Sequence, residues 1–154
     1  MPGHWEGDLL FGDAHSQIAT LVERHTRYVM LVKLVDKDSY TVAAALARHA
    51  RSLPQELYRS LTWDRGSGMA GHKRFTLATD IQVYFCDPHH PWQRGTNENT
   101  NGLLRQYLPK GLDLSGYSQA GLDAIAMQLN QRPRKTLGFR TPAEIFDECV
   151  VLTG

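Results

Sequence analysis

The sequence predicts one α/β domain, built on a mixed five-stranded sheet that carries helices on both faces. Three observations support this prediction. The chain has 154 residues, of which 42% are hydrophobic, and this is enough for one core. Three short apolar segments come first and are separated by short turns, as in an antiparallel meander. Strand-like and helix-like segments then alternate, which favours a mixed sheet with helices packed on it.

The first three strands are expected over 5–11, 17–23 and 28–35. All three segments are rich in aliphatic or aromatic side chains, and the first is apolar apart from Glu6 and Asp8. The two connections, 12–15 and 24–27, are short and mostly polar. Connections this short join antiparallel neighbours, so the three strands should lie side by side.

The remaining elements follow from helical periodicity and from the positions of turn-forming residues. We expect a helix over 42–53, a strand over 61–64, a helix over 70–79, a strand over 81–85, and helices over 96–107, 120–130 and 142–148. Ser39 or Thr41 is a candidate cap for the first helix. Thr141 is the expected cap of the last, with Pro142 at its first position. The ribonuclease H architecture has this order of elements.

The charge of the chain is uneven along its length. The net charge is only +1, but residues 92–140 hold seven Lys and Arg residues against three Asp and Glu residues. Such a bias marks either a surface that meets phosphates or an ordinary solvated face. No apolar run approaches the roughly 18 residues of a membrane span, and no signal peptide is visible. Cys86 and Cys149 stand alone, as reduced thiols of a cytoplasmic protein do.

Three carboxylates have unusual surroundings. Asp8 lies inside an apolar strand, where an ionised group needs a cation or hydrogen-bond donors. Asp64 ends a strand before a glycine-rich loop, which suits either a ligand site or a simple turn. Glu98 lies in a densely polar segment and shares a helical stripe with Asn101 and Arg105. That stripe is explained either by a metal-binding site near DNA or by an ordinary solvent face.

Taken together, the three carboxylates predict a metal site. Two Asp side chains from strands and a Glu from a helix are hard oxygen ligands that suit Mg²⁺ or Mn²⁺. Two such ions assist the cleavage and transfer of phosphodiesters. A zinc site is disfavoured, because His72, His89 and His90 match no zinc spacing and no cysteine joins them.

Several sequence blocks resemble bacterial insertion-sequence transposases of the IS-thirty type. The blocks that carry the resemblance are residues 3–9, 21–24, 85–88, 92–107, 130–138 and 141–144. The most specific of them is the block around Glu98, which reads WQRGTNENTNGLLRQY. The resemblance covers nearly the whole chain, so residues 1–154 are expected to form a single catalytic core. One departure is the loop after Asp64, which reads RGSGM where many relatives have Asn directly after this Asp.

The resemblance implies a DDE catalytic core with a ribonuclease H-like fold, related to retroviral integrases. The metal-binding carboxylates of the family then fall on Asp8, Asp64 and Glu98, with thirty-three residues between the last two. It implies two Mg²⁺ or Mn²⁺ ions as cofactors, with the element ends and a target duplex as DNA partners. It also implies assembly of a homo-oligomer on DNA, in the cytoplasm and at the nucleoid.

Polar and basic residues of the carboxy-terminal third are candidate DNA contacts, and two rival functions remain open. The candidate DNA-contact residues are Arg94, Asn97, Asn101, Arg105, Arg132, Arg134 and Lys135. We expect this chain to lack the amino-terminal helix-turn-helix region of the family, and therefore to lack recognition of the terminal repeats. One rival is a ribonuclease H-like nuclease that does not transpose. The other is a DNA-binding or assembly module of the same fold that does not catalyse.

Overall fold

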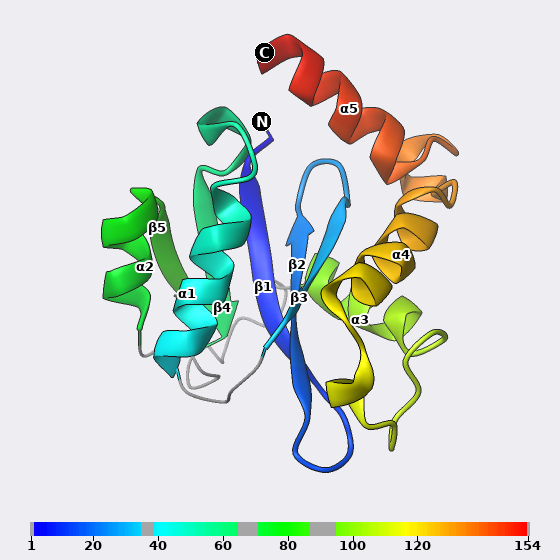
Figure 1. Ribbon diagram of the computed structural model, residues 1–154. Helices are drawn as coiled ribbons and strands as arrows, with labels where there is room; N and C mark the ends of the chain where they lie inside the picture. Colours follow the sequence, from blue (N-terminus) through cyan, green and yellow to red (C-terminus); the bar gives the residue numbers. More distant parts are fainter. Residues whose placement is uncertain (1, 35–38, 65–70, 87–94, 154) are drawn as a thin grey trace.

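Five strands form one mixed sheet in a computed structural model that describes residues 2–34, 39–64, 71–86 and 95–153 (Figure 1). The strands are β1 (His4–Phe11), β2 (Gln17–Glu23), β3 (Val29–Lys33), β4 (Ser60–Asp64) and β5 (Gln82–Cys86). Their order across the sheet is β3-β2-β1-β4-β5. β1 is therefore the central strand, antiparallel to β2 on one side and parallel to β4 on the other.

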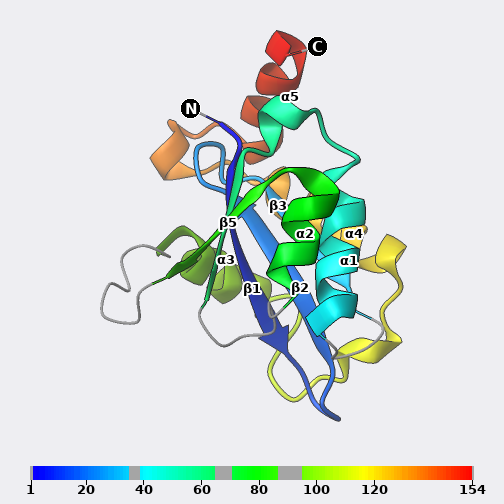
Figure 2. The same cartoon turned by 90° about the vertical axis from the view of Figure 1, so that its left-hand side faces the viewer.

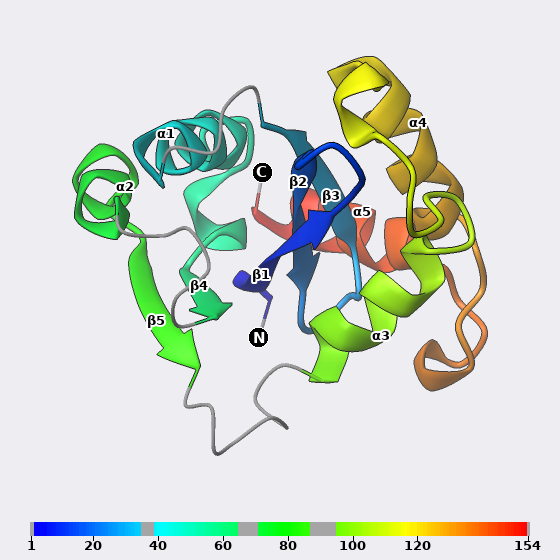
Figure 3. The same ribbon diagram turned by 90° about the horizontal axis from the view of Figure 1, so that it is seen from below.

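Helices cover both faces of the sheet, as the sequence predicts. They are α1 (Ser39–Ala50), α2 (His72–Thr79), α3 (Gly95–Leu104), α4 (Gln119–Asn130) and α5 (Pro142–Thr153). Figure 3 shows α1 and α2 on one side of the sheet and α3 and α4 on the other. In Figure 2, α1 and α2 lie side by side. Three short 3-10 helices, Gln55–Leu57, Leu114–Gly116 and Lys135–Leu137, were not expected from the sequence.

Successive side chains of β1 point to opposite faces of the sheet, so this strand contributes to two separate hydrophobic cores. Trp5 and Leu9 pack with side chains from α1, α2 and α5, including the fully buried Leu46. Leu10 belongs to the opposite core, where it packs with leucines of α3 and α4 such as Leu104 and Leu122. The central strand is thus buried on both faces, and a polar side chain on it lies beneath one helical layer or the other.

Several element boundaries differ from the predicted ones. α1 begins at Ser39, so Thr41 lies inside the helix and is not its cap. α3 ends at Leu104 rather than at residue 107, because the Tyr107 N–H bonds back to Leu104 in a tighter turn. α5 continues to residue 153 instead of 148. Thr141 does cap α5, since its hydroxyl accepts the Glu144 N–H at 3.1 Å.

α4 covers the free edge of β3 with two amide side chains. Asn130 accepts the Val29 N–H at 2.8 Å and donates to the Val29 carbonyl at 2.9 Å. Gln119, at the other end of the helix, accepts the Lys33 N–H at 2.8 Å and donates to the Leu31 carbonyl at 2.7 Å. An exposed strand edge can pair with another chain, so these amides take the place of a neighbouring strand.

A buried carboxylate organises the turn between β2 and β3. Glu23 is fully buried and accepts the N–H groups of Gly3, His25 and Thr26 as well as the Thr26 hydroxyl. These bonds tie the start of β1 to the turn. Tyr28 follows the same turn and stacks on Phe146 of α5, with ring centroids 4.1 Å apart.

Candidate active site

Asp8 presents its carboxylate toward the α3 layer from the middle of the sheet. It is half-buried on β1, two residues before Leu10, and alternation places both side chains on the same face. The Leu9 N–H donates to Asp8 Oδ1 at 2.8 Å. Asn101 Nδ2 donates to Asp8 Oδ2 at 3.2 Å. One donor on each oxygen holds the carboxylate in a defined orientation.

Asp64 occupies the matching position on the neighbouring strand. β1 and β4 run parallel, and Gly7 is the partner of Trp63 in their register. Asp8 and Asp64 directly follow this pair, and neighbouring strands lie about 4.8 Å apart. The backbone therefore brings Asp64, at the carboxyl end of β4, beside Asp8 in the middle of β1. The side chain of Asp64 lies outside what the structure describes.

A close contact between Gly7 and Trp63 fixes the relative position of the two strands. Both residues are buried, and a Cβ built on Gly7 would lie 2.3 Å from ring atoms of the Trp63 indole. Only glycine leaves room for the indole at this distance. The residues directly before Asp8 and Asp64 thus interlock. Sequence reasoning missed this contact, although the pairing of a small and a large residue before the two Asp residues was a visible signal.

α3 carries Glu98 past the same part of the sheet. Glu98 lies three residues before Asn101, which is one turn of the helix and about 4.5 Å along its axis. Positions separated by three residues share a helix face. Because Asn101 on that face reaches Asp8, the backbone of Glu98 lies on the face that α3 turns toward β1. The side chains of Glu98 and of its neighbour Asn97 lie outside what the structure describes.

Arg105 continues the stripe one turn further along the chain. Its guanidinium donates to the Phe11 carbonyl at 3.1 Å and to the Leu108 carbonyl at 3.4 Å. Arg105 therefore ties the end of β1 to the segment after α3. The sequence predicted that Asn101 and Arg105 share a face. Their partners in the structure, Asp8 and the Phe11 carbonyl, were not predicted.

The other candidate DNA-contact residues lie elsewhere. Arg94 is outside the described residues. Arg132, Arg134 and Lys135 lie between α4 and α5, near the turn between β2 and β3. Arg132 donates to Gln106 Oε1 at 3.2 Å, and Lys135 is exposed. Arg132 thus contacts the segment that follows α3, one residue from Arg105.

The described side chains include only part of the predicted metal site. Among them, no group of three or more His, Cys, Asp or Glu residues is placed to hold a metal ion. His72 contacts Phe85 edge-on, with ring centroids 5.0 Å apart, whereas His89 and His90 are outside the described residues. In the part of the chain that the structure describes, no helix is both long and apolar enough to cross a membrane.

The fold is that of a known catalytic core. The catalytic core domain of BIV integrase superposes with a TM-score of 0.70, covering 97% of this chain and 96% of that one at 18% sequence identity. Residues 1–91 match the family described as the integrase core domain. The ribonuclease H-like architecture expected from the order of elements is confirmed.

Curated relatives match over nearly the whole chain. The transposase InsI for insertion sequence element IS30A of Escherichia coli (strain K12) is 59% identical over 151 residues, which is 98% of this chain and 39% of that protein. The transposase for IS1086 of Cupriavidus metallidurans is 56% identical over 146 residues, or 94% of this chain and 43% of that protein. The chain thus spans about two fifths of the length of these relatives. The chain belongs to the integrase core domain family.

Proposed function

We propose that this chain is the metal-dependent catalytic core of a DNA transposase, with Asp8, Asp64 and Glu98 as its metal-binding carboxylates. The observation that carries the proposal is the hydrogen bond from Asn101 to Asp8. It joins the helix of Glu98 to the strand of Asp8, while the register of β1 and β4 sets Asp64 beside Asp8. Three elements that are far apart in the sequence therefore meet at one place.

The chemistry of these residues fits two Mg²⁺ or Mn²⁺ ions. Carboxylate oxygens are the ligands that such hard cations prefer, and Asp8 already has a fixed orientation. When bound, two such ions supply an activated attacking oxygen and a stabilised leaving oxygen at phosphorus. Asp8 and Asp64 would contribute from a rigid sheet and Glu98 from α3, so α3 must stay seated on the sheet. Asn101 and Arg105 hold it there.

The reaction we infer has two steps at the same site. Water first cleaves a phosphodiester at the end of the element and leaves a 3′-hydroxyl. That hydroxyl then attacks a phosphodiester of the target duplex and joins the two strands. Both steps are displacements at phosphorus, and we expect them on nucleoid DNA in the cytoplasm, within an assembly of several copies on the DNA.

A strand-joining assay tests this proposal directly. Labelled element ends and a target plasmid are incubated with the protein in Mg²⁺ or Mn²⁺, and cleaved and joined products are measured separately. Asp8→Asn and Glu98→Gln should each lower both products more than about 100-fold, which corresponds to roughly 3 kcal/mol of transition-state stabilisation. Asp80→Asn is the matched control, since Asp80 is exposed and has a left-handed φ of 60° that Asn tolerates. Cleavage without joining would indicate a nuclease, and DNA binding without either product would indicate a non-catalytic module.

A further inference from the structure

Two nitrogen atoms of the half-buried Arg134 guanidinium find no acceptor. Its Nε and Nη2 atoms are buried and make no hydrogen bond to any residue that the structure describes. Burial lowers the pKa of Arg134, and the nearby positive charges of Arg132 and Arg27 lower it further. A buried polar group without a partner destabilises a protein, and a charged one does so most. Such an arrangement is expected where a ligand supplies the missing acceptors.

The turn that carries Arg134 is held in a defined shape. The Arg134 N–H donates to the Arg140 carbonyl at 2.9 Å, and the Phe139 N–H donates to the Arg134 carbonyl at 2.8 Å. Gly138 and Phe139 are both left-handed, with φ of 64° and 66°. For a bulky residue such as Phe this conformation is unusual, and it persists only when the surroundings impose it.

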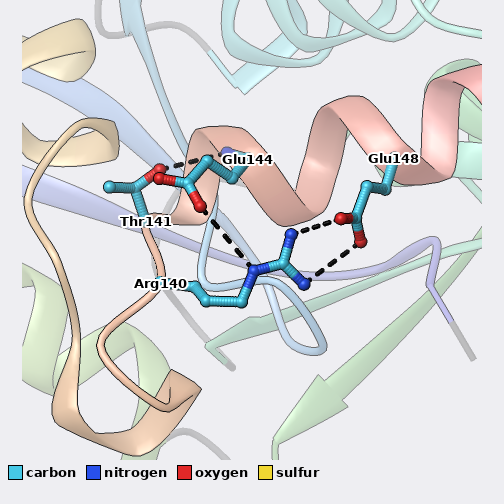
Figure 4. A network of polar contacts seen from close by, with 4 residues as sticks. All are labelled: Arg140, Thr141, Glu144 and Glu148. Carbon is cyan, nitrogen blue, oxygen red and sulfur yellow. Dashed lines mark hydrogen bonds and ion pairs between the residues drawn. The ribbon is translucent and has the colours of Figure 1, made fainter.

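Arg140, at the other end of this turn, provides a contrast. Its guanidinium binds the carboxylates of Glu144 and Glu148 on α5, and Figure 4 shows the three side chains converging. The charge of Arg140 is thus neutralised within the chain. The pKa of Arg134, in the same turn, is instead lowered by the positive charges of Arg132 and Arg27.

We propose that Arg134, with Arg132 and Arg27 beside it, binds a phosphate group of the DNA backbone. A phosphodiester carries a negative charge and the oxygen acceptors that Arg134 Nε and Nη2 lack, and arginine binds such groups in a planar, two-pronged geometry. Arg134 is partly exposed, so a phosphate can reach its outer edge and draw the guanidinium toward it. The choice of DNA as the source of the phosphate rests on the proposed function.

Two features of the site favour DNA over a free anion. Asp8 pairs with Thr20, Thr20 pairs with Leu31, and Arg27 lies four residues before Leu31. β3 begins at Val29, about 7 Å along the sheet from Leu31 at 3.3 Å per residue, and Arg27 lies beyond it in the turn. Arg27 and Asp8 are therefore separated along the sheet by at least about two base-pair steps of 3.4 Å. Phe139 of the same turn is 70% exposed, and an exposed aromatic ring beside basic side chains suits contact with nucleic acid.

The test compares Arg134→Met with Arg51→Met. The two changes remove the same charge, but Arg51 is exposed just beyond α1. In phosphate-free buffer, Arg134→Met should raise the melting temperature, because an unpartnered buried charge is replaced by an apolar side chain. Inorganic phosphate should raise the melting temperature of the wild type and of Arg51→Met but not that of Arg134→Met. A residue that is merely structural would lower the melting temperature when replaced and would leave the phosphate effect unchanged, which would overturn the proposal.

Binding to a duplex of random sequence then identifies the source of the phosphate. Arg134→Met should weaken this binding and reduce the slope of log affinity against log salt by about one, whereas Arg51→Met should not. An unchanged slope, with the phosphate effect lost, would overturn the assignment to DNA. Neither measurement involves Asp8, Asp64 or Glu98, so failure of the proposed catalytic function would be seen separately in the strand-joining assay.

Discussion

Asn101 is the residue that most directly connects the helix of Glu98 to Asp8. Its amide donates to Asp8 Oδ2, while the Leu9 N–H holds Oδ1. A side chain that orients a metal ligand commonly raises metal affinity without touching the metal. Asn101 is thus a positioning residue in the proposed site.

Replacing Asn101 should change the metal requirement of the reaction. In Asn101→Ala, the concentration of Mn²⁺ that gives half-maximal strand cleavage should rise by about 10- to 100-fold. Saturating Mn²⁺ should recover most of the rate, because the carboxylates themselves remain. Asn99→Ala, an exposed change on the same helix, should leave the Mn²⁺ titration unchanged. A uniform loss of rate at every Mn²⁺ concentration would argue against a positioning role.

Gly7 should tolerate no side chain. A Cβ at this position meets the Trp63 indole at 2.3 Å, and the indole is fully buried. Gly7→Ala should therefore lower the free energy of unfolding by about 1–3 kcal/mol, as overpacking of a core does. Gly102→Ala is the control, since nothing lies within 4 Å of its added Cβ and alanine favours a helix. Urea unfolding of both variants decides the matter, and equal stability of Gly7→Ala and wild type would refute the close contact.

Several residues of the candidate site could be predicted from the sequence, but the groups that they bond to could not. The apolar surroundings of Asp8 and the polar block around Glu98 singled out both carboxylates, and helical periodicity placed Glu98, Asn101 and Arg105 on one stripe. The bonds from Asn101 to Asp8 and from Arg105 to Phe11 were not predictable, because each crosses more than ninety residues of sequence. Only the folded packing of α3 against β1 determines them.

At the scale of elements, α4 acts as a cover for an edge strand. The two amides, Gln119 and Asn130, lie at opposite ends of the helix and bind the outward backbone groups of β3. The separation of the two amides along α4 thus matches the separation of the β3 backbone groups that they bind. This arrangement closes one edge of the sheet without a sixth strand, and Asn130, which is almost fully buried, contributes most to it.

Loss of Asn130 should destabilise the whole domain. In Asn130→Ala, the buried N–H and carbonyl of Val29 lose both their partners, and an unsatisfied buried group costs about 1–3 kcal/mol. Denaturant unfolding should show a loss of that order or larger. Gln131→Ala, one residue along and exposed, should change the unfolding free energy by less than about 0.5 kcal/mol. Similar stability of the two variants would mean that water replaces the amide without cost.

The sequence predicted which elements form better than where they end. Apolar periodicity and short turns predicted every strand of the described sheet and the helices that cover its two faces. α3 ends earlier than predicted because the chain tightens into a turn at Leu104, and α5 runs further because its Val150 packs against the core. Such endpoints depend on tertiary contacts that a periodic pattern does not contain.

At the scale of the whole molecule, the fold carries two separate polar sites along one sheet. Asp8 lies in the middle of β1, level with the carboxyl end of β4, and the arginine cluster of Arg27, Arg132 and Arg134 lies toward the turn between β2 and β3. In the functions proposed above, the first site carries the chemistry and the second fixes the position of the DNA, a division that proteins that bind DNA commonly use.

The central claim is that Asp8, Asp64 and Glu98 together hold metal ions, and a thermal unfolding titration with Mn²⁺ tests it most directly. A ligand that binds only the folded state, at 100 times its Kd, stabilises that state by about 2.7 kcal/mol. The melting temperature of the wild type and of the control Asp80→Asn should therefore rise with Mn²⁺. Most of this rise should be lost in Asp8→Asn, Asp64→Asn and Glu98→Gln. An equal rise in all five proteins would contradict the account, because the ion would then bind elsewhere.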